Sequence, residues 1–382
     1  MKRIFALLFL SHAWFVDIAY AQTSEEATTA FNKKDYVTAI AGFRKAAEQG
    51  DINAQLNVAM MYERGLGVAK DAALATEWLR KAAEQDVSMA QYKLSMRYYS
   101  ATGVKRDVQE GARWLRKAAE NGSSDAQYNV GLFSWDGNEG MAKDRTLAVA
   151  MYRDSAMQGD PRAQYNLGIL YANGDEVPKD ASQGFSWISK AAAQGFPQAS
   201  AALALMQSEG IGTSKDEAQA FASYRKAAEQ GELAAQYTLA TLYEQGKGTA
   251  KDDAEALRWI RKAADQSYGA ALSNLGTRYV YGNGAPKDQR MAVVLFQKGA
   301  DQGYAETQMK LGIMYFKGIE GTPDPGKAYF WWLVAAKSGS KGAQGLLPRA
   351  EGLLSVEQIA AQQAAAAKWA PENRRAAIEI PH

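Results

Sequence analysis

The chain of 382 residues has no cysteine and only two histidines. Without cysteine it cannot form disulfides, thiolate zinc sites, iron–sulfur clusters, cysteine nucleophiles or lipid anchors on cysteine. One histidine, His12, lies in an apolar leader, and the other, His382, is the last residue. Catalysis by a Ser–His–Asp triad, histidine metal sites and histidine acid–base chemistry are therefore not expected. The sequence predicts no cofactor and no metal site.

An excess of charge of one sign is also lacking, because 44 basic residues face 42 acidic ones. Such a balance provides no basic field for following nucleic acid, so we expect no nucleic-acid partner. The chain is 47% hydrophobic and 23% charged, which is typical of a soluble folded protein. After the leader, no stretch of sequence is long and apolar enough to span a bilayer.

Residues 1–21 resemble a cleavable export signal. Lys2 and Arg3 give a positive start, residues 4–10 are continuously apolar, and Ala19-Tyr20-Ala21 matches the small-x-small pattern of a signal-peptidase site. A membrane span is the less favoured interpretation, since a histidine and an aspartate interrupt a segment of only about 20 residues. We expect a mature chain without a stable membrane span, located in the periplasm or secreted.

The sequence after the leader consists of repeats. An alanine opens nearly every unit, and the intervals between openings are 36 residues with a single one of 37. Eight full units span 54–342, preceded by an incomplete one. The opening positions are Ala54, Ala90, Ala126, Ala163, Ala199, Ala235, Ala271 and Thr307.

Each unit has the pattern of two helices. The first begins at the alanine, with a large apolar residue four positions later, a small one at five and usually a tyrosine at eight, as in Leu167, Gly168 and Tyr171. Positions zero, four and eight share one helical face, and the small residue permits close approach of a neighbouring helix. Glycines at eleven and often thirteen, such as Gly65 and Gly67, end the helix and form a turn.

An aspartate about seventeen residues into every unit precedes the second helix. We interpret these residues as structural helix caps, because an aspartate at a helix start accepts hydrogen bonds from free backbone N–H groups. Glu110, Gln183, Gln219 and Glu255 follow their aspartates by three residues and resemble capping boxes. A ladder of cation-binding carboxylates is the less favoured interpretation. The aspartates are Asp71, Asp107, Asp144, Asp180, Asp216, Asp252, Asp288 and Asp324.

The second helix carries an aromatic residue near position twenty-four and often closes with Lys-Ala-Ala. Trp78, Trp114, Trp187, Trp259 and Trp331 occupy the aromatic position. Alanines permit tight packing, and aromatics fill the space between units. A row of sugar-stacking tryptophans is the alternative interpretation, but one tryptophan on the same helical face of each unit favours core packing.

The combination of alanine, Leu-Gly, tyrosine, Gly-x-Gly, Asp, Trp and Lys-Ala-Ala over 36 residues resembles the Sel-one-like repeat (SLR) family, relatives of tetratricopeptide repeats. The resemblance covers about three quarters of the chain. It implies an all-α fold, a right-handed α/α superhelix (solenoid) of stacked helix-turn-helix repeats. Some bacterial SLR proteins are cysteine-rich, and the penicillin-binding or lactamase activity suggested for that branch is not carried over to this cysteine-free chain.

The predicted organisation has five segments. The signal peptide of 1–21 is followed by an N-terminal tetratricopeptide-like hairpin at 22–53 and by the eight repeats at 54–342. A C-terminal capping helix region follows at 343–370, where Ser355 and Gln358 form a capping-box pattern. Residues 371–382 are expected to form a mobile tail.

The resemblance also suggests a binding surface. In tetratricopeptide-like superhelices the first helices line the concave face, and positions two, six, nine and ten after the opening residue face the groove. We expect Tyr99 and Trp135, at position nine, to be exposed in the groove, whereas the tyrosines at position two also suit core packing between first helices. The candidate partner-binding residues are Tyr92, Met96, Tyr99, Tyr128, Leu132, Trp135, Tyr165 and Ile169.

These features favour a non-enzymatic repeat scaffold of the cell envelope. Its partner would be a protein or peptide bound on the concave face, where a strip of aromatic side chains gives contact area at low entropic cost. An envelope enzyme acting on peptidoglycan or polysaccharide is the alternative, with a cell-wall polymer as its partner, and a pair of carboxylates in one cleft would favour it. A structural spacer or a secreted factor that meets a host protein is a third interpretation.

Overall fold

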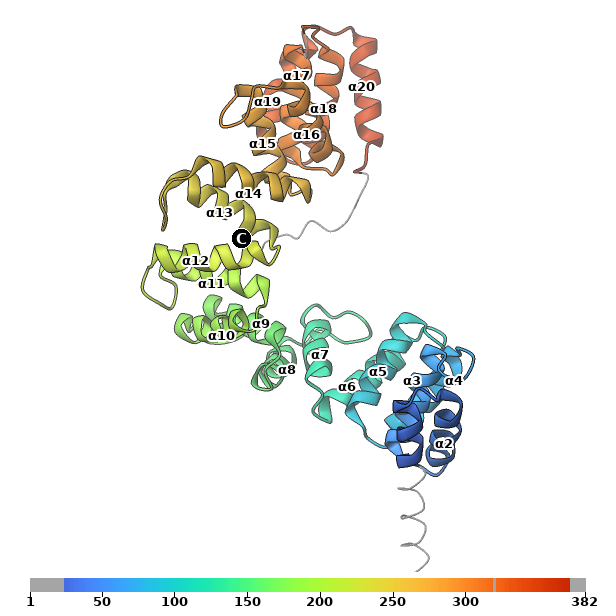
Figure 1. The fold of residues 1–382 in the computed structure, drawn as a ribbon. Coiled ribbons are helices and arrows are strands. Elements are labelled where there is room, and N and C mark those ends of the chain that lie inside the picture. Colours follow the sequence, from blue (N-terminus) through green and yellow to red (C-terminus); the bar gives the residue numbers. More distant parts are fainter. Residues whose placement is uncertain (1–23, 319–320, 372–382) are drawn as a thin grey trace, which may run out of the picture. The chain divides into compact units, whose positions relative to one another are not determined.

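A computed structural model describes residues 24–318 and 321–371. The predicted signal peptide at 1–21 and positions 372–382 of the predicted tail lie outside the described residues. Figure 1 shows that the described chain is built from helices, and no described helix has both the length and the apolar character needed to cross a membrane.

Residues 24–32 are helical, and the helices that follow are 13 residues long except for α19. They are α2 (Tyr36–Glu48), α3 (Ile52–Arg64), α4 (Ala72–Glu84), α5 (Ser88–Ser100), α6 (Val108–Glu120), α7 (Ser124–Asp136), α8 (Arg145–Met157), α9 (Pro161–Asn173), α10 (Ala181–Ala193), α11 (Pro197–Glu209), α12 (Glu217–Glu229), α13 (Leu233–Gln245), α14 (Asp253–Asp265), α15 (Gly269–Tyr281), α16 (Gln289–Asp301), α17 (Ala305–Lys317), α18 (Pro325–Lys337), α19 (Lys341–Glu351) and α20 (Val356–Lys368).

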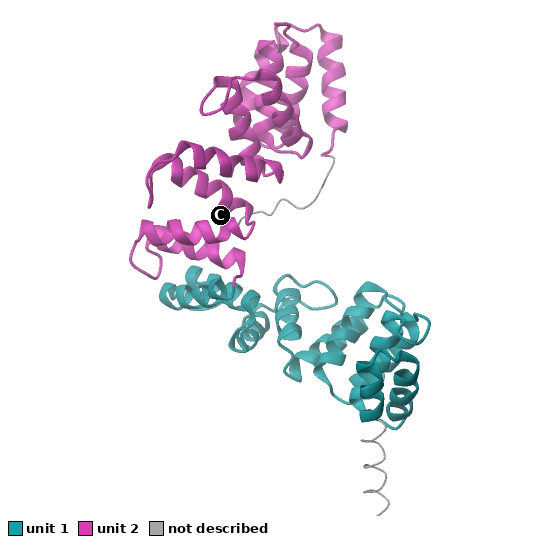
Figure 2. Ribbon diagram, viewed as in Figure 1, with its two compact units in different colours: residues 1–194 teal, residues 195–382 magenta. Residues whose placement is uncertain are grey.

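The chain divides into two compact units, residues 1–194 and 195–382 (Figure 2). Within each unit, the two helices of a repeat pack on each other, as α5 does on α6 and α13 on α14. The second helix then packs on the first helix of the next repeat, as α6 does on α7. At the end of unit 2, α20 packs on α18. This tandem stacking confirms the predicted all-α solenoid of helix-turn-helix repeats.

The eight repeated aspartates hold the two helices of each repeat together. Asp71 is the N-cap of α4, and its side chain accepts hydrogen bonds from the backbone N–H groups of Ala73 and Leu74. Its own N–H donates to the carbonyl oxygen of Tyr62 in α3, at 3.0 Å. The same two-sided arrangement recurs at Asp107, Asp144, Asp180, Asp216, Asp252, Asp288 and Asp324.

The capping boxes expected at Glu110, Gln183, Gln219 and Glu255 do not form. A capping box needs the backbone N–H of the N-cap residue, and in these repeats that N–H already donates to the first helix. Glu110 instead accepts two hydrogen bonds from Arg113. The box predicted in the C-terminal region does form, between Ser355 and Gln358 at the start of α20.

The second glycine of the turn is required by a close backbone contact. Gly67 has φ of 70°, and a Cβ atom there would lie 2.2 Å from the carbonyl oxygen of Tyr36 in the preceding second helix. Gly103 meets Ala72 in the same way, at 2.0 Å. A side chain at Gly67 or Gly103 would therefore collide with the backbone of the preceding second helix.

A buried glutamine joins three consecutive helices. The Gln91 side chain in α5 donates from Nε2 to the carbonyl oxygen of Ala83 in α4, at 3.0 Å. Its Oε1 accepts a hydrogen bond from Asn121, the residue that ends α6, at 2.9 Å. Corresponding pairs of bonds are made by Gln55, Gln127, Gln164 and Gln236. We call this arrangement the glutamine bridge.

The glutamine bridge is incomplete at Gln308. Its Nε2 donates to the carbonyl oxygen of Ala300 at 3.1 Å, but its Oε1 is buried without a hydrogen-bond partner. The reason is that Ser338 stands where the other repeats have a glutamine or asparagine, and serine is too short to reach. A buried acceptor without a partner is unfavourable for folding.

The repeated tryptophans belong to the core. Trp78, Trp114, Trp259 and Trp331 are 3–7% exposed, and Trp187 is half-buried. A lysine one helical turn later lies over the ring of each of these tryptophans except Trp331, with Lys81 Nζ 3.8 Å from the Trp78 ring centre. The Trp331 ring instead meets Phe330 and Trp369 edge-to-face. Their ring faces are therefore not open for stacking a sugar.

Ser338→Gln should stabilise the protein by about 1 kcal/mol, because the new side chain amide can donate to the unpaired Oε1 of Gln308. Denaturant titration followed by circular dichroism measures the free energy of unfolding. Ser338→Met is the control, because it adds a side chain of similar length without a donor. An equal gain from methionine would show that packing, and not completion of the bridge, is responsible.

Candidate functional site

The first helices of the repeats present one surface in each unit. We call this surface, formed by α3, α5, α7 and α9 in unit 1 and by α11, α13, α15 and α17 in unit 2, the first-helix face. In unit 2 it contains two adjoining cavities of about 320 Å³ and 360 Å³, which share Thr277 and Lys310 as lining residues. We call the smaller one the polar cavity and the larger one the apolar cavity.

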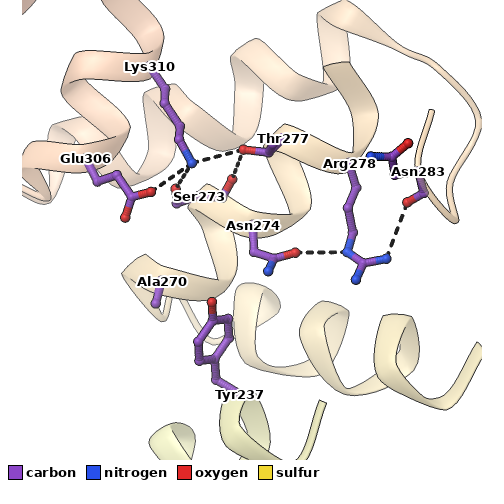
Figure 3. Close-up of a pocket in the computed structure, with 9 residues that line it drawn as sticks. All are labelled: Tyr237, Ala270, Ser273, Asn274, Thr277, Arg278, Asn283, Glu306 and Lys310. Atoms are coloured by element: carbon purple, nitrogen blue, oxygen red, sulfur yellow. Dashed lines mark hydrogen bonds and ion pairs between the residues drawn. The ribbon is translucent and has the colours of Figure 1, made fainter. Parts of the chain in front are cut away.

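Lys310 lies where the two cavities meet. Figure 3 shows its ammonium group reaching from α17 to α15, where Nζ donates to Ser273 Oγ at 2.7 Å and to Thr277 Oγ1 at 3.0 Å. Nζ also forms an ion pair with Glu306 at 2.8 Å. Partial burial opposes ionisation of Glu306, but its hydrogen bonds with Lys310 and Ser273 outweigh this and lower the pKa of the carboxyl group. The lysine charge is thus neutralised and its position fixed.

A second fixed cation lines the polar cavity. Arg278 donates from Nε to Asn274 Oδ1 at 2.9 Å and from Nη1 to the carbonyl oxygen of Asn283 at 3.3 Å (Figure 3). It also forms an ion pair with Glu244 of the preceding repeat, and only 15% of the arginine side chain is exposed. The polar cavity therefore has paired charges and a lining rich in amide and hydroxyl groups.

The apolar cavity has a different lining. Val280, Met309, Ile313, Met314 and Phe296 supply its apolar surface. No carboxylate lines the cavity. Three lysines do, and these are Lys287, Lys310 and Lys317.

The positions that line these cavities follow the rule stated for the groove. Positions two, six, nine and ten of the last two full repeats include Thr277, Val280, Tyr281, Met309 and Ile313, and all five line the apolar cavity. The candidate residues selected from the sequence came from earlier repeats. The same rule applied to these two repeats would have found this surface, because their groove positions are also rich in apolar side chains.

Unit 1 has a smaller cavity of the same kind on its first-helix face. Its volume is about 300 Å³, and Glu63, Met96 and Arg97 form part of its lining. Met96, one of the candidate residues predicted from the sequence, therefore lies at a cavity. Arg97 forms an ion pair with Glu63 at 2.9 Å. Unit 2 has the same pair in Arg278 and Glu244. In both pairs the arginine stands at position seven of its repeat and the glutamate at position nine of the preceding repeat.

Tyr99 and Trp135, expected to be exposed, are half-buried and take part in packing. The Tyr99 ring meets Phe133 edge-to-face at 5.7 Å, and its hydroxyl donates to the carbonyl oxygen of Glu139 at 3.1 Å. Trp135 packs against the cluster around Tyr152, with the Arg145 guanidinium 4.9 Å from its ring centre. Both rings therefore join adjacent elements and keep only part of their surface open.

The tyrosines at position two lie between neighbouring first helices. The Tyr92 hydroxyl accepts a hydrogen bond from Asn129 at 3.1 Å, and the Arg162 guanidinium lies 4.3 Å from the ring centre of Tyr128. Tyr165 and Ile169 in α9 are half-buried as well, which leaves Leu132, 40% exposed, as the most open of the eight candidates.

Carboxylates do not gather in the cavities. A fourth cavity, of about 510 Å³, lies between the start of α18 and α20. One carboxylate lines the polar cavity, Glu306, and one lines the cavity of unit 1, Glu63. Asp324 is the one carboxylate of the fourth cavity, and the apolar cavity has none. Among the residues that the structure describes, no group of three or more histidine, aspartate or glutamate side chains is placed to hold a metal ion.

Stacked helix hairpins with cavities on the first-helix face define an α-solenoid repeat protein. A family model described as Sel1 repeat matches the chain at 33–51, 52–87, 88–123, 124–160, 161–196, 197–232, 233–268, 269–304 and 305–340. The chain belongs to the Sel1 repeat family. Proteins of this family are typically protein-interaction scaffolds and are generally not enzymes.

Solved structures of the same family are similar to this chain. A Sel1 repeat protein from Oxalobacter formigenes is 32% identical, with a TM-score of 0.64, and the match covers 80% of this chain and 88% of that one. A protective antigen of uropathogenic Escherichia coli strains with an SLR fold is 27% identical, with a TM-score of 0.54 and coverage of 91% and 90%. No curated protein matches the chain.

Deprotonation of the Tyr99 hydroxyl at alkaline pH should lower the free energy of unfolding. Burial, followed by the nearby Glu139 charge, raises the pKa of this hydroxyl from 10.0 to about 12. The folded state therefore holds this proton more tightly than the unfolded state, so stability is lost as pH rises from 10.0 to about 12. Tyr99→Phe should reduce that loss by about 1 kcal/mol, since partial exposure screens the effect.

Denaturant titrations of both proteins at the two ends of this pH range measure the difference. Tyr281→Phe removes a phenol that is 67% exposed and serves as the control. Equal alkaline losses in wild type and in Tyr99→Phe would contradict the assignment.

Proposed function

We propose that this protein is a non-enzymatic scaffold that binds a protein or peptide partner on its first-helix face, the predicted concave side of the solenoid. The observation that supports this most strongly is the pair of adjoining cavities in unit 2, whose lining includes groove positions of consecutive repeats. Cavities along successive first helices suit a partner segment that crosses several repeats.

The lining of the cavities favours binding over hydrolysis of a glycan. Glycoside hydrolysis ordinarily needs two carboxyl groups on either side of the scissile bond. Each of the four cavities has at most one carboxylate in its lining, and Glu306 is held in an ion pair by Lys310. The tryptophans that could have stacked a polysaccharide are in the core or under a lysine.

The binding face is tested by charge substitutions on the two sides of unit 1. Leu132, 40% exposed in α7, belongs to the first-helix face, whereas Met157, 65% exposed, ends the second helix α8. Leu132→Asp should weaken capture of the partner from envelope extracts at least tenfold, which corresponds to about 1.4 kcal/mol. Met157→Asp should leave it unchanged.

Captured proteins are identified by mass spectrometry, and circular dichroism confirms that both variants keep their helices. Equal capture by wild type, Leu132→Asp and Met157→Asp would show that the partner does not use this face.

We also propose that the protein acts in the cell envelope, on the basis of the signal-like leader. Expression of the full chain in a bacterial host should give a periplasmic or secreted product that begins at Gln22, because cleavage is expected after Ala21. Intact-mass measurement of the fractionated protein tests this. A product in the cytoplasmic fraction that still contains Lys2 and Arg3 would refute it.

A further inference from the structure

We propose that the apolar cavity between α15 and α17 receives a bulky apolar side chain from an acidic segment of the partner. This inference rests on the proposed function and specifies the chemistry of the peptide. It follows from three properties of the cavity: its apolar lining, its two exposed lysines and its connection to the polar cavity.

The apolar lining fits one large side chain. At about 360 Å³ the cavity is at the small end of ordinary ligand sites, which span roughly 300–1,000 Å³. Phe296 and Met314 are buried at its base, and Ile313 and Val280 are half-buried beside them. Met309 adds a second flexible thioether, which lets the walls adapt to leucine, methionine or an aromatic ring.

The charges around the cavity favour carboxylates on the partner. Lys310 is neutralised by Glu306, but Lys287 and Lys317 are exposed, and no ion pair joins either of them to a carboxylate within the described parts of the chain. Two exposed ammonium groups beside an apolar surface attract a segment with an apolar side chain between acidic ones, and repel a basic segment.

The polar cavity offers hydrogen bonds for the main chain of the same segment. Asn274 accepts from Arg278 through Oδ1, which leaves its amino group to donate to a peptide carbonyl (Figure 3). Tyr237 and Asn283 line the same cavity. Because Thr277 and Lys310 line both cavities, a peptide can place its backbone in one and its side chain in the other.

Three fluorescent pentapeptides with blocked ends test the proposal. The first has leucine between two pairs of glutamates, the second has lysines in place of the glutamates, and the third has alanine in place of leucine. Binding to the whole protein is measured by fluorescence anisotropy at low salt, where charge effects are strongest. The test variant is Lys287→Glu/Lys317→Glu.

The control variant is Lys341→Glu/Lys368→Glu, which makes the same change in net charge at exposed lysines of α19 and α20. Wild type and control should bind the acidic leucine peptide at least tenfold more tightly than the lysine or alanine peptide. The test variant should lose at least tenfold in affinity for the acidic peptide and should prefer the lysine peptide.

Equal binding of acidic and lysine peptides by wild type would overturn the proposal, as would no binding of the acidic peptide or an equal loss in the control variant. Self-association that Lys287→Glu/Lys317→Glu abolishes, seen by sedimentation, would assign the cavity to a second copy of the chain and would also overturn it. The capture experiment with Leu132→Asp is separate. If capture depends on that residue while the peptides do not discriminate, only this inference fails.

Discussion

The glutamine bridge is the hydrogen-bonded contact that fixes the stacking of repeats wherever glutamine follows the opening residue, which it does in all full repeats except those that begin at Ala199 and Ala271. A buried amide needs partners for its donor and its acceptor, and Gln91 finds them only when α4, α5 and α6 are in register. The neighbouring alanines have no long side chain to keep the helices apart. Since each bridge joins one repeat to the next, stability accumulates from local contacts along each unit, as expected for a solenoid.

The same construction separates the residues that hold the fold from those that we propose to determine binding. Alanine, glutamine, aspartate and the turn glycines are fixed by hydrogen bonds or close contacts with the next helix. Groove positions on the first helices vary more from repeat to repeat, with Tyr99 and Trp135 in unit 1 and Met309 and Lys317 in unit 2. Function therefore depends on side chains grafted onto a repeated frame.

Charge pairing decides which cations remain available on the first-helix face of unit 2. Arg278 and Lys310 have their charges neutralised by Glu244 and Glu306. The Arg278–Glu244 pair joins consecutive repeats, as do the hydrogen bonds of Lys310 to Ser273 and Thr277. Lys287 and Lys317 are left as the charges that an incoming group would meet at the apolar cavity. The polar contacts thus fix the shape of the site, and its exposed lysines are the basis of the proposed preference for an acidic partner segment.

The amino-acid sequence by itself determined the repeat length, the helix pair within each repeat, the family and the aspartates at the helix starts. These are local properties, because a period, a cap and a turn depend on residues close together in the chain. Glutamine follows the opening residue in most repeats, but nothing in the sequence indicates that Gln91 meets Asn121, 30 residues away.

Only the tertiary structure decided how much of each candidate side chain is open. Tyr99 and Trp135 share a helical position with groove residues, yet their rings reach across to the next element and become half-buried. The capping boxes predicted at the second helices do not form for a related reason, because the N–H of the N-cap residue already donates to another helix. Whether a position is groove or core depends on the distance to a neighbouring helix, which only packing sets.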